Sequence, residues 1–137
     1  MSAYNLAILA AGTFFLVALI TGVWKYLEIV ASPEAKAHPY VDIAHRSALM
    51  YSFAAILLSV FVQISELPAT LEFWAALMPL VFFGLAIASY IAQGWIQRTD
   101  NQLRDAHGSV GVFMWALIVA EIGGFSVLFY GVIIAIF

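Results

Sequence analysis

The sequence has 137 residues, of which 65% are hydrophobic and only 9% are charged, with a formal net charge of −3. A soluble domain carries roughly 25% charged residues, so this chain lacks the polar groups to cover a water-facing globule, and lipid must solvate most of its exterior. The chain contains no cysteine, which excludes disulfides, thiolate metal sites and a cysteine nucleophile, and it has no basic run suited to nucleic acid.

Four long apolar runs follow one another along the chain, at residues 6–27, 48–65, 73–95 and 110–137. Each is near or above the ~20 residues needed to cross the hydrocarbon layer, where every backbone polar group must be paired, so each run is expected to be helical. We therefore predict an all-α polytopic membrane protein, a bundle of four transmembrane helices in a single domain over residues 1–137. The helices are expected at about residues 5–29, 43–66, 72–97 and 106–136.

The connections carry turn and capping residues. The triplet Ser32-Pro33-Glu34 predicts a short interfacial helix capped by Ser32, and Asp42 is then expected to cap the second membrane helix. The tight turn Glu66-Leu67-Pro68 makes the second and third helices antiparallel neighbours. Pro79 is expected to kink the third helix or to mark its first turns.

The cationic residues are distributed on one side of the predicted membrane. All five lie in or beside the first and third connections: Lys25, Lys36, Arg46, Arg98 and Arg104. Because positive charge is retained on the cytoplasmic side, we predict an inner-membrane protein with both termini outside. Loops 30–44 and 98–105 are then cytoplasmic.

The two halves of the chain resemble each other weakly, which indicates an internal repeat of two helical hairpins. Gly12 and Gly22 correspond in spacing to Gly84 and Gly94. Ala-His-X-Ser opens the second helix at residues 44–47 and the fourth at 106–109. The alternative is chance similarity among helices rich in alanine and glycine.

If the repeat is real, His45 and His107 lie at the same depth on equivalent helices. Each could be an interfacial polar residue or a helix cap, but the pairing favours a ligand role. Imidazole is the usual protein ligand of haem iron, and apolar helices suit a porphyrin. Zinc is disfavoured, because no thiolate or carboxylate cluster accompanies the histidines. His45 and His107 are thus candidate cofactor ligands, with His45 the candidate metal ligand.

Polar side chains recur along the second and fourth helices. At 100° per residue, Ser52, Ser59 and Gln63 share the face of His45, whereas Gly111, Met114 and Glu121 share that of His107. Both faces are expected to point into the bundle. Glu121 lies near the bilayer midplane, where a charge costs at least roughly 2.5–3.5 kcal/mol. It is either a proton-handling group or a neutral carboxyl that joins helices.

Two tyrosines are further candidates. Tyr51 and Tyr90 could be ordinary aromatic packing, or their phenols could polarise an oxygen of a bound substrate. With Glu121 they form the candidate catalytic set.

The run Ala44-His45-Arg46-Ser47-Ala48-Leu49-Met50-Tyr51 resembles the second-helix motif of the four-helix membrane isomerases typified by styrene oxide isomerase and hydroxylaminobenzene mutase. The resemblance implies haem b with His45 as axial ligand, a homotrimer with the haem near a subunit boundary, and a substrate-positioning role for Tyr90. The family has an asparagine where this chain has Tyr51, and the glycine that follows it there is Ser52 here.

Three functions follow from these residues. The first is a haem-containing isomerase or mutase acting on a small apolar epoxide or hydroxylamine-type substrate that arrives through the lipid. The second is a non-catalytic b-type cytochrome that uses His45 and His107 as a bis-histidine pair. The third is a structural or assembly subunit without a cofactor.

Overall fold

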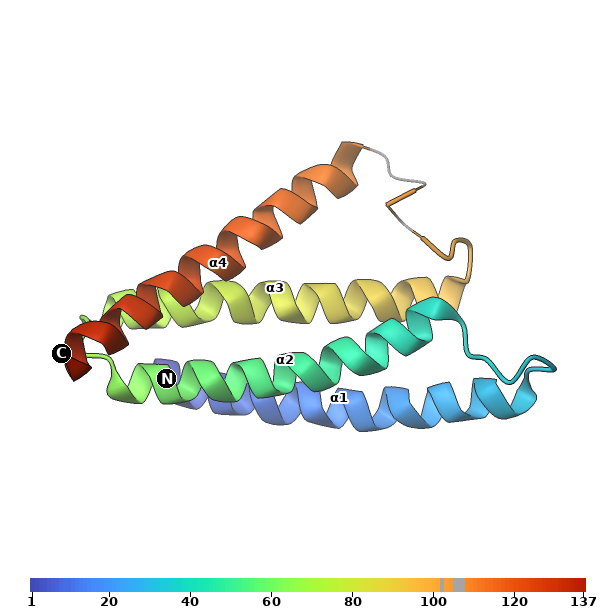
Figure 1. Ribbon diagram of the computed structural model, residues 1–137, viewed down its shortest axis with the longest axis horizontal. Coiled ribbons are helices and arrows are strands. Elements are labelled where there is room, and N and C mark those ends of the chain that lie inside the picture. The colour runs from blue at the N-terminus through green and yellow to red at the C-terminus, as the bar shows by residue number, and fades with distance from the viewer. Residues whose placement is uncertain (102, 105–107) are drawn as a thin grey trace.

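The computed structural model describes residues 1–101, 103–104 and 108–137. Within these ranges the chain forms four α-helices, α1 (Ala3–Ala31), α2 (Pro39–Ile64), α3 (Ala69–Ile96) and α4 (Gly108–Ile136) (Figure 1). All four are long and apolar enough to cross a membrane. The predicted all-helical, four-helix membrane bundle is therefore confirmed.

The helices run alternately up and down, so both termini lie at one end of the bundle (Figure 1). We call the other end, where α1 and α3 end and α2 and α4 begin, the cationic end, since Lys25, Lys36, Arg46, Arg98 and Arg104 belong to it. α2 packs against both α1 and α3, and α4 packs against α3 and α2. Toward the cationic end α4 leans away from α3 (Figure 1).

Small side chains form much of the core. The buried alanines come from the first three helices: Ala3, Ala7, Ala11, Ala18, Ala44, Ala48, Ala55, Ala75, Ala76 and Ala86. Small residues let helix backbones approach closely. Because lipid tails are as apolar as the side chains, moving a side chain out of lipid gains little free energy, and close packing drives helix association instead. Large apolar side chains such as Leu9, Phe53 and Trp115 are exposed accordingly and face the lipid.

The prediction of a short helix that starts at Ser32 is wrong. Ser32 is the C-cap of α1, and its backbone N–H donates to the carbonyl oxygens of Glu28 and Ile29. Its hydroxyl oxygen accepts from the N–H of Glu34, and Ala35 has a φ of 52°. Serine and proline are as typical of turns as of helix starts, and here they form a turn between α1 and α2.

The prediction that Asp42 caps the second helix is also wrong, because α2 begins at Pro39. His38 is the N-cap, and its Nδ1 accepts from the N–H of Tyr40 at 3.3 Å. Proline is favoured at the first helical position, since its fixed φ suits the helix and its missing N–H needs no partner there. Asp42 is thereby left free for contacts with other side chains.

Pro79 lies inside α3, which continues from Ala69 to Ile96. It does not mark the first turns of the helix. Its ring is fully buried, at the point where Gly124 of α4 crosses: a Cβ at Gly124 would lie 2.5 Å from the carbonyl oxygen of Ala75 and 2.7 Å from Cδ of Pro79. Pro79 is therefore part of the contact between α3 and α4.

Among the described residues, the corresponding glycines of the two halves make different contacts. Gly22 of α1 faces His45 of α2, its hairpin partner. Gly94, the corresponding residue of α3, instead packs against Val41 of α2 and Trp24 of α1. The buried residues of α4 are Leu117, Leu128, Gly131 and Val132, mostly in its C-terminal half.

Candidate functional site

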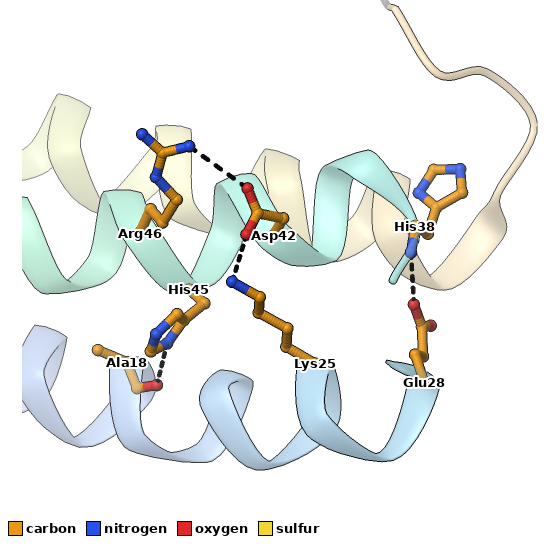
Figure 2. Close-up of polar contacts among 7 residues, drawn as sticks. All are labelled: Ala18, Lys25, Glu28, His38, Asp42, His45 and Arg46. Carbon is orange, nitrogen blue, oxygen red and sulfur yellow. Dashed lines mark hydrogen bonds and ion pairs between the residues drawn. The ribbon is translucent and has the colours of Figure 1, made fainter. Parts of the chain in front are cut away.

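His45 lies in the second turn of α2 and faces α1. Its Nδ1 is 2.8 Å from the carbonyl oxygen of Ala18 (Figure 2). Because a carbonyl oxygen can only accept, this hydrogen bond places the proton on Nδ1 and leaves Nε2 as the acceptor. The imidazole is half-buried, so the α1 backbone holds one ring nitrogen while the other stays available.

Gly22 provides the room for this imidazole. A Cβ at Gly22 would lie 3.0 Å from Cε1 and 3.1 Å from Nδ1 of His45, closer than ordinary packing. Thr21, beside it, donates its hydroxyl to the carbonyl oxygens of Val17 and Ala18, at 2.8 and 3.1 Å. One turn of α1 thus supplies both a hydrogen-bond acceptor and space for the ring.

An ion-pair cluster lies one turn closer to the cationic end. Asp42 accepts from Nζ of Lys25 at 2.5 Å and from the guanidinium of Arg46 at 3.5 Å (Figure 2). Lys25 and Asp42 are each about one-third exposed. Such partly exposed pairs contribute about 0–1 kcal/mol, so the cluster mainly fixes the register between α1 and α2.

Glu28 joins three separate segments of the chain. Its Oε1 accepts from Nε1 of Trp24 at 3.0 Å and from Nε2 of Gln97 at 3.1 Å. Its Oε2 accepts from the backbone N–H of His38 at 2.8 Å (Figure 2). Periodicity within α1 gives no signal for this role, because the partners of Glu28 lie up to 69 positions away. It ties α1 to the start of α2 and the end of α3.

The candidate tyrosines, Tyr51 of α2 and Tyr90 of α3, lie between these two helices. The ring of Tyr51 stacks on Phe83, with centroids 4.2 Å apart, and Tyr90 stacks with Tyr40 at 6.2 Å. Tyr51 lies within electrostatic reach of both Tyr90 and Glu121. The structure therefore brings Tyr51, Tyr90 and Glu121 into one region, between α2, α3 and α4.

Glu121 points inward from α4 into a pocket of about 270 Å³. We call this the Glu121 pocket; its other walls include Leu57 and Leu58 of α2, Pro79 and Phe83 of α3, and Phe125 of α4. Oε1 of Glu121 is buried and has no hydrogen-bond partner among the described residues. A buried polar atom without a partner is uncommon in native structures and calls for an explanation.

α2 separates His45 from this region. Tyr51 follows His45 by six residues, or 600°, and Ala54 of the Glu121 pocket follows it by nine, or 900°, so both lie on other sides of the helix. The candidate residues thus form two groups, a histidine site against α1 and a phenol–carboxyl group against α3 and α4. His107 lies outside the described residues. In the ranges that the structure describes, no group of three or more His, Cys, Asp or Glu side chains could hold a metal ion.

The predicted polar faces are only partly internal. Ser52 and Ser59 are buried, and their hydroxyls donate to the carbonyl oxygens of Leu49 and Ile56 in their own helix. Gln63 and Gly111 are exposed. Hydroxyls satisfied within one helix are poor ligand groups, so these serines fill space between helices.

No protein-family model, curated protein or solved structure matches the chain.

Proposed function

We propose that the chain is a haem-b-binding protein of the inner membrane, with an isomerase- or mutase-like activity on a small apolar epoxide or hydroxylamine-type molecule. The observation that carries the proposal is the hydrogen bond from Nδ1 of His45 to the carbonyl oxygen of Ala18. Histidines that bind metals commonly donate their other N–H to a backbone carbonyl, which fixes the tautomer and orients the ring. The resemblance of residues 44–51 to the membrane isomerases adds the haem and the reaction class.

The residues around His45 fit an axial ligand in an apolar setting. Nε2 is left as an acceptor, as a haem iron requires, and a single histidine suffices to hold haem. Along the same side of α1 and α2 runs a groove of about 270 Å³, lined by Gly12, Phe15, Ser52, Phe53 and Ile56. When bound, haem would supply a Lewis-acidic iron to an oxygen or nitrogen atom of the substrate.

Tyr51, Tyr90 and Glu121 are proposed to orient the substrate and to carry its protons. Their mutual proximity supports this role, since phenols and a carboxyl in an apolar setting can exchange protons with a bound molecule. α2 separates them from His45 within one chain, so we propose that a neighbouring copy brings its own set toward the haem. A homo-oligomer, a trimer by the family resemblance, would then complete the site.

The proposed orientation rests on charge. The cationic end holds every lysine and arginine, and the positive-inside rule assigns that end to the cytoplasm. Both termini and the connection between α2 and α3 then lie outside. The lipid bilayer is the partner of the exposed apolar side chains.

The absorption spectrum of the full chain, purified in detergent from haem-replete cells, tests the proposal. A Soret band is expected in the parent protein and in the control His38→Ala, which removes a different imidazole, one that caps α2 and stacks on Tyr40. It should be absent from His45→Ala in protein that remains folded by circular dichroism. A colourless parent protein, or a His45→Ala variant that keeps its haem, would rule the proposal out.

A structural subunit without a cofactor is the second candidate. The bond between His45 and Ala18 also joins α2 to α1, and Ser52 and Ser59 satisfy themselves within α2. If these contacts serve packing alone, the parent protein is colourless and His45→Ala changes its stability without changing any spectrum.

A further inference from the structure

The Glu121 pocket is almost entirely apolar. Besides Glu121 it is lined by aliphatic side chains, a proline and two phenylalanines. Its volume of about 270 Å³ is slightly below that of typical drug-sized sites, so it suits a molecule the size of one substituted aromatic ring. A pocket of this composition selects an apolar body and presents it with a single polar group.

Glu121 is held in place by the packing of α4. It follows the buried Leu117 by four residues and precedes Gly124 and Leu128 by three and seven, so all four share the inward face of the helix. At Gly124 the backbones of α4 and α3 approach closely. The packing of α4 thereby places Glu121 on the side of the helix that meets α2 and α3.

The pocket opens toward the lipid. Leu57, Ile122 and Phe125 line it and are 44%, 63% and 36% exposed. A molecule dissolved in the bilayer can reach the carboxyl by passing these apolar side chains. No aqueous route is needed.

The carboxyl lacks a partner of either kind. Oε1 has no hydrogen-bond partner, and no lysine or arginine is ion-paired with Glu121, among the residues that the structure describes. A buried polar group without a partner is costly, and a ligand that supplies the missing donor recovers that free energy. An amine can form this hydrogen bond in either protonation state. An ammonium donates to the carboxylate, and a neutral amine accepts from the protonated carboxyl.

From these observations we infer that the Glu121 pocket binds a small apolar amine that enters from the bilayer. The nitrogen hydrogen-bonds to Oε1 of Glu121, and the apolar body lies against Leu58 and Phe83. The inference goes beyond the proposed reaction, because it requires neither haem nor turnover. It depends on the α2, α3 and α4 walls alone.

Fluorine NMR of the full chain in detergent tests this site with three probes of nearly equal size: 4-fluorobenzylamine, 4-fluorobenzyl alcohol and 4-fluorotoluene. The amine is expected to bind saturably and at least about tenfold more tightly than the alcohol or the hydrocarbon, because a charge-assisted bond is roughly twice as strong as a neutral one. Glu121→Gln should weaken amine binding at least about tenfold and leave the hydrocarbon unchanged.

Three further variants distinguish binding in the pocket from general partitioning of the probes into detergent. Glu66→Gln makes the same chemical change at an exposed position and should bind the amine as the parent does. Ala54→Leu places extra carbon atoms in the pocket and should weaken all three probes. His45→Ala should retain the ranking, because His45 lies on another side of α2, so the outcome does not depend on haem.

The proposal is overturned if the alcohol or the hydrocarbon binds as tightly as the amine. It is equally overturned if the amine signal grows linearly with detergent, or if Glu121→Gln, folded by circular dichroism, keeps full amine affinity. If Glu121→Gln does not fold, the test rests on Ala54→Leu. Unchanged amine affinity in that variant overturns the proposal.

Discussion

His45 and Ala18 join α2 to α1 through a 2.8 Å hydrogen bond between the imidazole Nδ1 and a backbone carbonyl oxygen. Since the acceptor is backbone, a substitution of Ala18 leaves it in place. The position of the ring can instead be altered at Gly22, which lies against it. Glycine substitutions in α1 therefore test whether Gly22 holds the imidazole of His45 in this position.

Gly22→Ala is expected to displace the imidazole of His45. The new methyl group would lie 3.0 Å from Cε1, so the ring or the helix must shift, and overpacking of this kind costs about 1–3 kcal/mol. Thermal unfolding in detergent should show the loss. If haem is bound as proposed, the Soret band should weaken or shift in the same variant.

Gly12→Ala is the matched control for Gly22→Ala. It lies in the same helix, and a Cβ there would meet nothing within 4 Å. Its effect should stay within about 0.5 kcal/mol of the parent, as for ordinary surface substitutions. Equal losses in both variants would contradict a specific contact between Gly22 and His45.

Gly124→Ala is expected to push α4 away from α3. The added Cβ would meet the carbonyl oxygen of Ala75 and the ring of Pro79, neither of which can rotate aside, and the cost should be about 1–3 kcal/mol. Gly123→Ala, its neighbour, meets nothing within 4 Å and should unfold at the parent temperature. A stable Gly124→Ala protein would show that the two helices do not approach as closely as described.

Glu28→Gln should destabilise the cationic end. The carboxylate accepts from Trp24, His38 and Gln97, whereas an amide has one accepting oxygen and must turn its NH₂ group toward a donor. We expect a loss of about 1–3 kcal/mol in unfolding experiments. Glu34→Gln, at an exposed residue whose contact with Lys36 spans 3.6 Å, should be neutral, and a comparable loss there would point to net charge instead.

The absence of cysteine from the sequence permits a direct test of orientation. Glu66→Cys and Lys36→Cys introduce single thiols at exposed positions on opposite ends of the bundle. In intact cells a membrane-impermeant maleimide should label Glu66→Cys, and Lys36→Cys only after the membrane is opened. The reverse labelling pattern would show that the protein has the opposite orientation in the membrane.

Hydropathy was sufficient to predict the helices, because the bilayer requires long apolar helical runs. The sequence predicts a helix in place of the turn after Ser32, because serine and proline open helices and turns alike. The His38-Pro39 pair at the end of this turn carries the correct signal for the start of α2, since proline favours the first position of a helix. The membrane interior was thus easier to predict than its connections.

Periodicity predicts on which side of each helix a candidate residue lies, but not how the four helices bring the candidates together. Periodicity placed His45 and Glu121 on inward faces, and both do point toward neighbouring helices. Periodicity within one helix cannot say which neighbour a face meets, so the separation of His45 from Tyr51 and Glu121 by α2 required the packing of all four helices. The contacts of Glu28 likewise join residues far apart in the sequence.

The hydrogen bonds of Glu28 also bear on the order in which the helices assemble. Its partners Trp24, His38 and Gln97 all precede α4, so the first three helices can complete these hydrogen bonds while the fourth is still being synthesised. α4, with Leu117, Leu128, Gly131 and Val132 as its buried residues, then docks on a surface that already exists. Of these four helices α4 leaves the ribosome after the other three, and its docking closes the Glu121 pocket.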